Sequence, residues 1–127
     1  MAATEEKKQP RRIGQVVYLR PECLEEYKNC HAEVWPEVLE QIKDSNIKDY
    51  SIFLVDYPRP TLFASFKWVG EDWDSDMARM AANPKVQEWW KMTDGMQESL
   101  NKEQGATGST GKVPWWREGN EVFYYDP

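Results

Sequence analysis

Two strand-like segments separated by a short proline-rich turn constrain the fold of this chain most strongly. Residues 50–57 (Tyr-Ser-Ile-Phe-Leu-Val-Asp-Tyr) and 61–69 (Thr-Leu-Phe-Ala-Ser-Phe-Lys-Trp-Val) are rich in β-branched and aromatic side chains, a composition typical of strands. Only Pro58-Arg59-Pro60 lies between them. The sequence therefore predicts an antiparallel hairpin in the middle of the chain.

Helical patterns flank this hairpin on both sides. Before it, an apolar stripe recurs at helical spacing from Leu24 to Ile42. Pro36 falls within that stripe, so the helix should kink or restart there. After the hairpin, residues 71–82 match a helix, and Asn83-Pro84 combines a good N-cap with a proline suited to a first turn. A further helix should therefore begin at Pro84.

Two more strands are predicted near the ends of the chain, at residues 12–19 and 121–125. The complete order is strand, helix, strand, strand, helix in two pieces, strand. This order predicts an α+β, ferredoxin-like fold, in which an antiparallel four-stranded sheet carries helices on one face. Because the strands have apolar residues on both faces, we expect a homodimer whose two sheets pack together.

The length of the chain favours a single domain. A chain of 127 residues can bury about two-thirds of its unfolded surface, which is enough for a core without disulfides or metal. Residues 11–127 should form this domain. The polar residues 1–10 are expected to be a disordered tail, and the glycine-rich stretch 101–114 a mobile loop.

Charge and cysteine spacing exclude several classes of partner. With 16 basic and 22 acidic residues the net charge is −6, so neither nucleic acid nor an anionic membrane surface is an expected partner. Cys23 and Cys30 are seven residues apart on one predicted helix, a span of about 10 Å that exceeds the roughly 7 Å reach of a disulfide. They are interpreted as free thiols in a reducing compartment.

Targeting and metal signals point the same way. No apolar core of a secretion signal precedes residue 12, no apolar run reaches the ~20 residues of a membrane span, and no histidine or cysteine set has metal-ligand spacing. We therefore expect a soluble cytoplasmic protein that uses no metal.

His31 is the only histidine of the chain, and Tyr27 precedes it by four residues, one helical turn away on the same face. Imidazole titrates near neutrality, so this pair could grip a hydroxylated small molecule and move one of its protons. From spacing alone, packing within the inward helical stripe is the preferred interpretation. The same holds for Tyr50 and for Trp89-Trp90, although indole faces also stack on sugar rings.

Trp115-Trp116 follow the glycine-rich stretch. They could fold over a pocket, but simple packing against the last strand is the preferred interpretation.

A longer motif favours a functional role for His31, Tyr27, Tyr50 and Trp89-Trp90 over simple packing. Residues 27–37 (Tyr-Lys-Asn-Cys-His-Ala-Glu-Val-Trp-Pro-Glu) resemble the Tyr-x-x-x-His-x-x-x-Trp-Pro-Glu signature of the L-rhamnose mutarotase family. The resemblance continues in order along nearly all of the chain from Arg12 onward, through residues 50–54, 62–64, 89–94 and 121–124. Several motifs at compatible spacing make the match specific.

This resemblance implies an isomerase that interconverts the α and β anomers of L-rhamnose or a similar deoxy sugar. It implies a dimeric α/β barrel without metal or cofactor, and a monosaccharide as the small-molecule partner. The family's proton donor corresponds to His31, and its sugar-binding positions to Tyr27, Tyr50, Trp89 and Trp90. The chain departs from the family in its longer 101–114 connection, its charged N-terminal tail, and an apparent extra residue at Val55.

The chemistry fits these residues. Anomer exchange opens the hemiacetal, so the ring oxygen gains a proton while the anomeric hydroxyl loses one, and His31 is expected to act as the acid at the ring oxygen. The base stays open between a bound water and one of the tyrosines. Two alternatives to the mutarotase are a non-catalytic sugar-binding or regulatory dimer, and an oxygenase on the same sheet architecture, which fold analogy alone supports.

Overall fold

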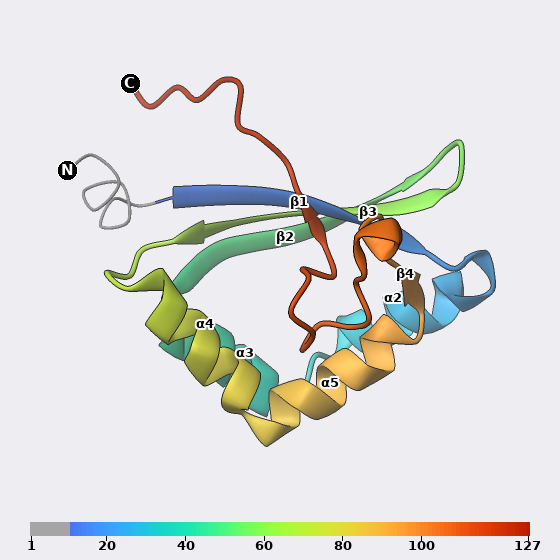
Figure 1. Ribbon diagram of the computed structural model, residues 1–127, viewed down its shortest axis with the longest axis horizontal. Helices are drawn as coiled ribbons and strands as arrows, with labels where there is room; N and C mark the ends of the chain where they lie inside the picture. Colours follow the sequence, from blue (N-terminus) through green and yellow to red (C-terminus); the bar gives the residue numbers. More distant parts are fainter. Residues whose placement is uncertain (1–10) are drawn as a thin grey trace.

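The computed structural model describes residues 11–127, and the expected disordered tail at residues 1–10 lies outside them. One antiparallel sheet forms one layer and the helices form the other (Figure 1). The strand order β2-β3-β1-β4 is the order that a ferredoxin-like sheet requires. The α+β prediction is therefore confirmed.

The central hairpin forms as the sequence predicted. Strands β2 (Ile47–Asp56) and β3 (Pro60–Trp68) pair antiparallel from Asp56↔Pro60 onward, and β1 (Arg11–Leu19) pairs with the other edge of β3. Strand β2 begins three residues earlier than the pattern indicated. A register shift between Lys48 and Ser51 lies beside Tyr50 and marks the irregular start of this strand.

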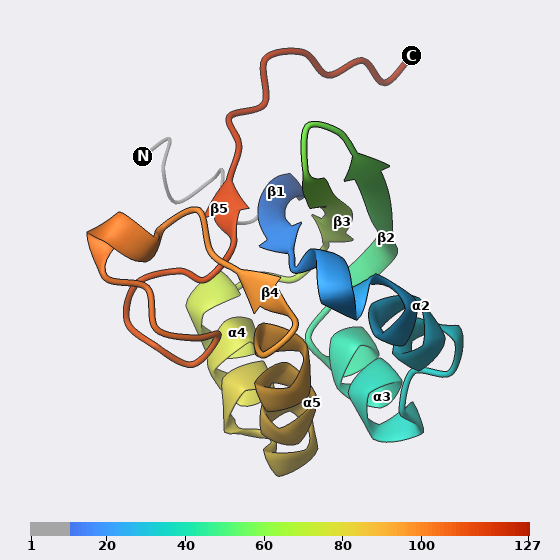
Figure 2. The same cartoon turned by 90° about the vertical axis from the view of Figure 1, so that its right-hand side faces the viewer.

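Two helices begin at the prolines where the sequence predicted a start, Pro36 and Pro84, whereas the helix predicted over residues 71–82 begins two residues later, at Trp73. A short 3-10 turn, η1 (Pro21–Cys23), leads into α2 (Leu24–Ala32), and α3 (Pro36–Asp44) then restarts at the proline. Helix α4 (Trp73–Ala82) is followed by α5 (Pro84–Asp94), whose N-cap Asn83 accepts a hydrogen bond from the Lys85 backbone N–H at 2.9 Å. Within residues 11–127 the four α-helices cover the same face of the sheet, as two perpendicular views show (Figures 1 and 2).

The fourth strand is not the one that the sequence predicted. Strand β4 (Gln97–Glu98) pairs with the end of β1, and β5 (Arg117–Glu118) pairs with its middle, so both occupy the free edge of β1. Residues 121–125 form no strand, and the prediction of a closing strand there is wrong. Strands β4 and β5 occupy the free edge of β1, and beyond them Gly14 accepts a backbone hydrogen bond from Gly119 at 2.8 Å. Residues 121–125 therefore lack a partner strand among residues 11–127. Their apolar side chains are exposed in the single chain.

The core fills the space between the inner sheet face and the helices. Alternate residues of β1 and β3 point inward and form two clusters of buried side chains. One cluster centres on Trp68 and Phe66 against α4 and α5, and the other on Leu19, Leu62 and Tyr27 beneath α2. Tyr27 is thus a core residue as well as a predicted site residue.

A buried carboxylate ties three elements together at the first of these clusters. Asp76 on α4 is 5% exposed and accepts hydrogen bonds at 2.9 Å from Trp68 Nε1 and Asn46 Nδ2, while Arg79 pairs with its other oxygen at 2.9 Å. Burial alone would raise the pKa of Asp76, but the three donors outweigh it and hold the pKa below its ordinary value. At Gly70 a Cβ would stand only 2.3 Å from Asp76 Oδ2, so this junction also requires the glycine.

We expect Asp76→Ala to lower the free energy of unfolding by about 2–4 kcal/mol, because it leaves two buried N–H donors and a nearby cation without their acceptor. Chemical denaturation at pH 7 measures the loss. Since the folded pKa is depressed, the wild-type advantage should be present above the unfolded pKa and vanish as pH falls through the folded one. Asp76→Asn, which keeps the shape and one acceptor, is the control. A loss below about 1 kcal/mol for Asp76→Ala, within the range of one ordinary hydrogen bond, would contradict the assignment.

Candidate active site

A cavity of about 390 Å³ lies between the inner sheet face and the helices. Its volume is within the range of small-molecule sites. Its wall includes all five residues singled out in the sequence, which come from three separate elements: α2, β2 and α5. They are Tyr27, His31, Tyr50, Trp89 and Trp90. The fold therefore brings together residues that are up to 63 positions apart, from Tyr27 to Trp90.

The ring of His31 is fixed by contacts with Tyr27 on the same helix, α2. Its ring stacks on that of Tyr27, with centroids 4.1 Å apart and planes inclined by 27°, as four-residue spacing allows. Its Nδ1 is 3.0 Å from the Tyr27 backbone carbonyl oxygen. A carbonyl can only accept, so this contact places a proton on Nδ1 and leaves Nε2 as the nitrogen free to react.

Cys30 lies closer to this imidazole than neighbouring positions on a helix would suggest. Its Sγ is 3.3 Å from His31 Nδ1 and also 3.3 Å from the Tyr27 carbonyl oxygen. Burial raises the pKa of the Cys30 thiol, so the sulfur stays protonated and does not form a thiolate–imidazolium pair.

The imidazole is neutral at rest. Burial lowers the pKa of His31, and the bond to the Tyr27 carbonyl offsets only part of that effect. At pH 7 the ring therefore carries its proton on Nδ1 and a lone pair on Nε2. In this state it can accept a proton and then return it.

The two tyrosines remain phenols. Burial raises the pKa of Tyr27 well above its usual range and that of Tyr50 to about 12. Tyr50 is 39% exposed as a residue, but the ring packs on Phe66 with centroids 5.1 Å apart and its hydroxyl is desolvated. Neither tyrosinate is populated at neutral pH, which argues against a tyrosine as the base.

Trp89 and Trp90 differ in how deeply they are buried. Trp89 is 6% exposed, and its ring meets His31 edge-on at 5.2 Å and Trp35 at 5.1 Å between centroids. Trp90 is only partly buried and packs on the neighbouring core cluster. Both tryptophans line the cavity. Trp89 in addition supports the His31 ring, whereas Trp90 forms part of the cavity wall.

Sequence reasoning missed the contribution of the chain after α5. Gln97, Ser109 and Trp116 all line the cavity, so the expectation that the Trp115-Trp116 pair only packs on a strand is incomplete. Ser109 reaches the site because its backbone N–H and hydroxyl both donate to Asp94, at 2.8 and 2.6 Å. The tryptophan pair behind a glycine-rich stretch was the one signal available for this.

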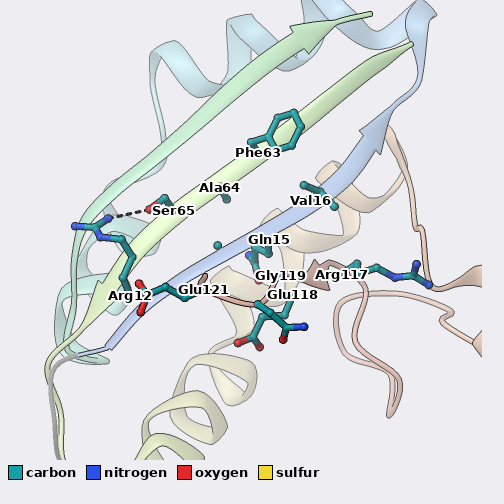
Figure 3. Close-up of a pocket in the computed structure, with 12 residues that line it drawn as sticks. Arg12, Gln15, Val16, Phe63, Ala64, Ser65, Arg117, Glu118, Gly119 and Glu121 are labelled. Atoms are coloured by element: carbon teal, nitrogen blue, oxygen red, sulfur yellow. Dashed lines mark hydrogen bonds between the residues drawn. The ribbon is translucent and has the colours of Figure 1, made fainter. Parts of the chain in front are cut away.

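A second cavity, of about 500 Å³, lies on the outer sheet face beside the C-terminal segment. Figure 3 shows Phe63 and Val16 over the strands, with Arg12 donating a 2.8 Å hydrogen bond to Ser65 Oγ. It is larger than the first cavity but includes no histidine and none of the five predicted site residues. Because His31, the only histidine of the chain, and the other four predicted residues line the inner cavity, we take that cavity as the candidate active site.

Residues 11–127 were also compared with the requirements of a metal site and of a membrane-spanning helix. Within residues 11–127 no group of three or more histidine, cysteine, aspartate or glutamate side chains is arranged to hold a metal ion. A search of the same residues for a helix that could cross a membrane found none.

Comparison with known proteins gives a consistent result. A family model described as L-rhamnose mutarotase matches residues 12–125. An L-rhamnose mutarotase of Mannheimia succiniciproducens is 34% identical over 91% of this chain and 98% of its own length, and one of Phocaeicola vulgatus is 40% identical over 58% of this chain and 67% of its own. The crystal structure of L-rhamnose mutarotase from Formosa agariphila superposes with a TM-score of 0.67 at 27% identity, covering 91% of this chain and 99% of that one.

The geometry of the tryptophan pair predicts unequal roles in stability. Trp89→Ala removes a ring that is almost fully buried and should cost about 3–5 kcal/mol of unfolding free energy. Trp90→Ala removes a partly exposed ring, so its cost should be smaller. Denaturant melts of both variants measure the difference. Equal losses, or a larger loss at Trp90, would contradict the assignment of Trp89 as the residue that supports the His31 ring.

Proposed function

The chain belongs to the L-rhamnose mutarotase family, and we propose that it interconverts the α and β anomers of L-rhamnose or a similar deoxy sugar. This activity is that of an isomerase. The observation that carries the proposal is the convergence of His31, Tyr27, Tyr50 and the Trp89-Trp90 pair on one cavity. A monosaccharide is small enough for that volume, and its two kinds of surface, hydroxyl groups and C–H faces, match phenol and indole walls.

In this proposal His31 carries the proton through the reaction. Neutral Nε2 accepts the proton of the anomeric hydroxyl and delivers it to the ring oxygen, which is bonded to the same carbon. The bond from the anomeric carbon to the ring oxygen breaks as the carbonyl forms. After the aldehyde end rotates, the reverse transfer closes the ring on the other face. His31 is thus the acid at the ring oxygen, and its own lone pair serves as the base.

The remaining residues bind and orient the sugar. The phenols of Tyr27 and Tyr50 keep their protons and can donate to sugar oxygens, because burial raises both pKa values. The indole rings of Trp89 and Trp90 stack on C–H faces. A non-catalytic sugar-binding dimer would need no titratable group on the wall, so the free Nε2 of a half-buried imidazole favours catalysis.

We expect His31→Gln to lower the catalysed rate of anomer exchange by roughly 10²–10⁴-fold while the protein stays folded, because glutamine can hydrogen-bond but cannot titrate. Saturation-transfer NMR between the two anomeric protons of L-rhamnose, with the spontaneous rate subtracted, measures the exchange. A variant as active as the wild type would refute the role of His31.

The pH dependence of the same rate tests the order of proton transfer. Because the lowered pKa of His31 lies below its ordinary value of about 6.5, kcat/KM should be flat at neutral pH. It should fall as pH decreases through that pKa, since imidazolium cannot accept the anomeric proton. An enzyme-dependent rate that rises on acidification would show that imidazolium is the starting form.

We also propose a homodimer with the two sheets packed outer face to outer face. On that face Phe53 and Phe63, directly opposite each other in the register, are 61% and 41% exposed, and Val55 is 44% exposed. Exposed apolar side chains of the C-terminal segment, Val122 to Tyr125, extend the apolar surface. Several exposed large apolar side chains on one sheet face are typical of an interface.

We further propose that the protein is cytoplasmic. Cys23 and Cys30 are free thiols in the structure, which suits a reducing compartment.

Phe53→Glu should convert the dimer to a monomer, because it places a charge at the centre of the proposed interface, where burying it unpaired is costly. Light scattering coupled to size exclusion gives the mass. Lys43→Glu, a change at an exposed position of α3 in the helical layer, is the control. A wild-type protein that runs as a monomer at micromolar concentration would disprove the dimer.

A further inference from the structure

Gln97 links the site to the chain that follows α5. It is the first residue of β4 and is only 2% exposed. Its Nε2 lies 3.3 Å from the hydroxyl oxygen of Tyr27, and its Oε1 lies 2.9 Å from Trp115 Nε1. The amide therefore bridges a sugar-binding tyrosine and a tryptophan that lies outside the family motifs found in the sequence.

The direction of these two hydrogen bonds follows from the groups involved. An indole N–H can only donate, so Trp115 must face the carbonyl oxygen of the amide, and this fixes which way the amide is turned. The amide nitrogen can then only donate to the Tyr27 oxygen. Within residues 11–127 no hydrogen bond in the structure takes up the hydrogen of the Tyr27 hydroxyl itself. That hydrogen is left for an acceptor in the cavity.

We propose that Gln97 is a positioning residue, which holds the Tyr27 hydroxyl as a hydrogen-bond donor toward a sugar oxygen, and that Trp115 locks Gln97 in the orientation this requires. The inference rests on the proposed function and adds two residues to the five that define the site. Without Gln97 the phenol could rotate or be bridged by water. With it, the donor faces the cavity before the sugar binds, so less ordering is needed on binding.

The segment that supplies Trp115 is tied to the protein by several bonds. Ser99 donates its hydroxyl hydrogen to the Trp115 carbonyl oxygen, and Asn101 Nδ2 donates to the Pro114 carbonyl oxygen at 2.8 Å. Asp94 holds Ser109, which lies earlier in the same segment. The ends of the 101–114 connection are thereby joined to each other, its middle is fixed at Ser109, and the tryptophan that follows it is placed against Gln97.

A double-mutant cycle separates positioning through Tyr27 from a merely structural role. Gln97→Met keeps the length of the side chain and removes both polar contacts. We expect it to lower kcat/KM for anomer exchange by about 3- to 10-fold in the wild type, the range of a single hydrogen bond. In the Tyr27→Phe background, which lacks the hydroxyl, the same change should cost less than about 2-fold. Gln87→Met on the exposed side of α5 is the matched control and should be silent in both backgrounds.

Each outcome of the cycle decides the inference. An equal cost of Gln97→Met in both backgrounds, through general loss of structure or through direct contact of Gln97 with the sugar, would overturn it. If Gln97→Met fails to fold, Trp115→Phe, which keeps a smaller aromatic ring but loses the N–H donor, completes the same cycle with a smaller expected cost. A wild-type protein without exchange activity would instead overturn the proposed function on which the inference rests.

Discussion

The stacking of His31 on Tyr27 is the contact on which the candidate site depends, because it joins to the core the imidazole that we propose transfers the proton. Tyr27 packs with Leu19 and Leu62 beneath α2, so its ring cannot move without disturbing the sheet. His31 takes its orientation from this ring and from the backbone carbonyl of the same residue. The His31 imidazole is therefore fixed by a single turn of helix, and the rigidity of the sheet is transmitted to it.

The helices cover only one face of the sheet, and this explains why the candidate active site lies on that face. Helices cover the inner face (Figure 1), so the cavity there is walled by apolar side chains that lower the pKa of His31 and raise those of Tyr27 and Tyr50. All three shifts favour the uncharged forms, namely one acceptor nitrogen and two donor hydroxyls. This combination suits the ring opening that we propose, because among residues 11–127 no charged side chain lines the cavity to compete for the sugar oxygens.

Local signals in the sequence were enough for most of the fold, but the five residues that line the cavity were singled out by the family resemblance, because their spacing alone favoured packing. Three such local signals are the alternation in residues 61–69, Pro36, and Asn83-Pro84. Each acts through neighbouring residues in the chain, and the expected strand or helix start is present in the structure at each of them. The fourth strand was misplaced because Gln97-Glu98 is too short to carry a pattern, and its pairing with β1 is decided by where α5 ends. The hydrogen bond between Gln97 and Trp115 could not be predicted for a similar reason, since it spans 18 residues and depends on the folded connection between them.

The central claim is that His31, neutral and protonated on Nδ1, exchanges a proton with the sugar through Nε2. Because the chain has a single histidine, NMR of untagged protein labelled with ¹⁵N in histidine gives one imidazole to follow. We expect the Nδ1–H tautomer at pH 7, a titration below the ordinary pKa of about 6.5, and a selective shift of the Nε2 resonance when L-rhamnose is added. An Nε2–H tautomer, or an imidazole whose signals ignore the sugar, would contradict the account.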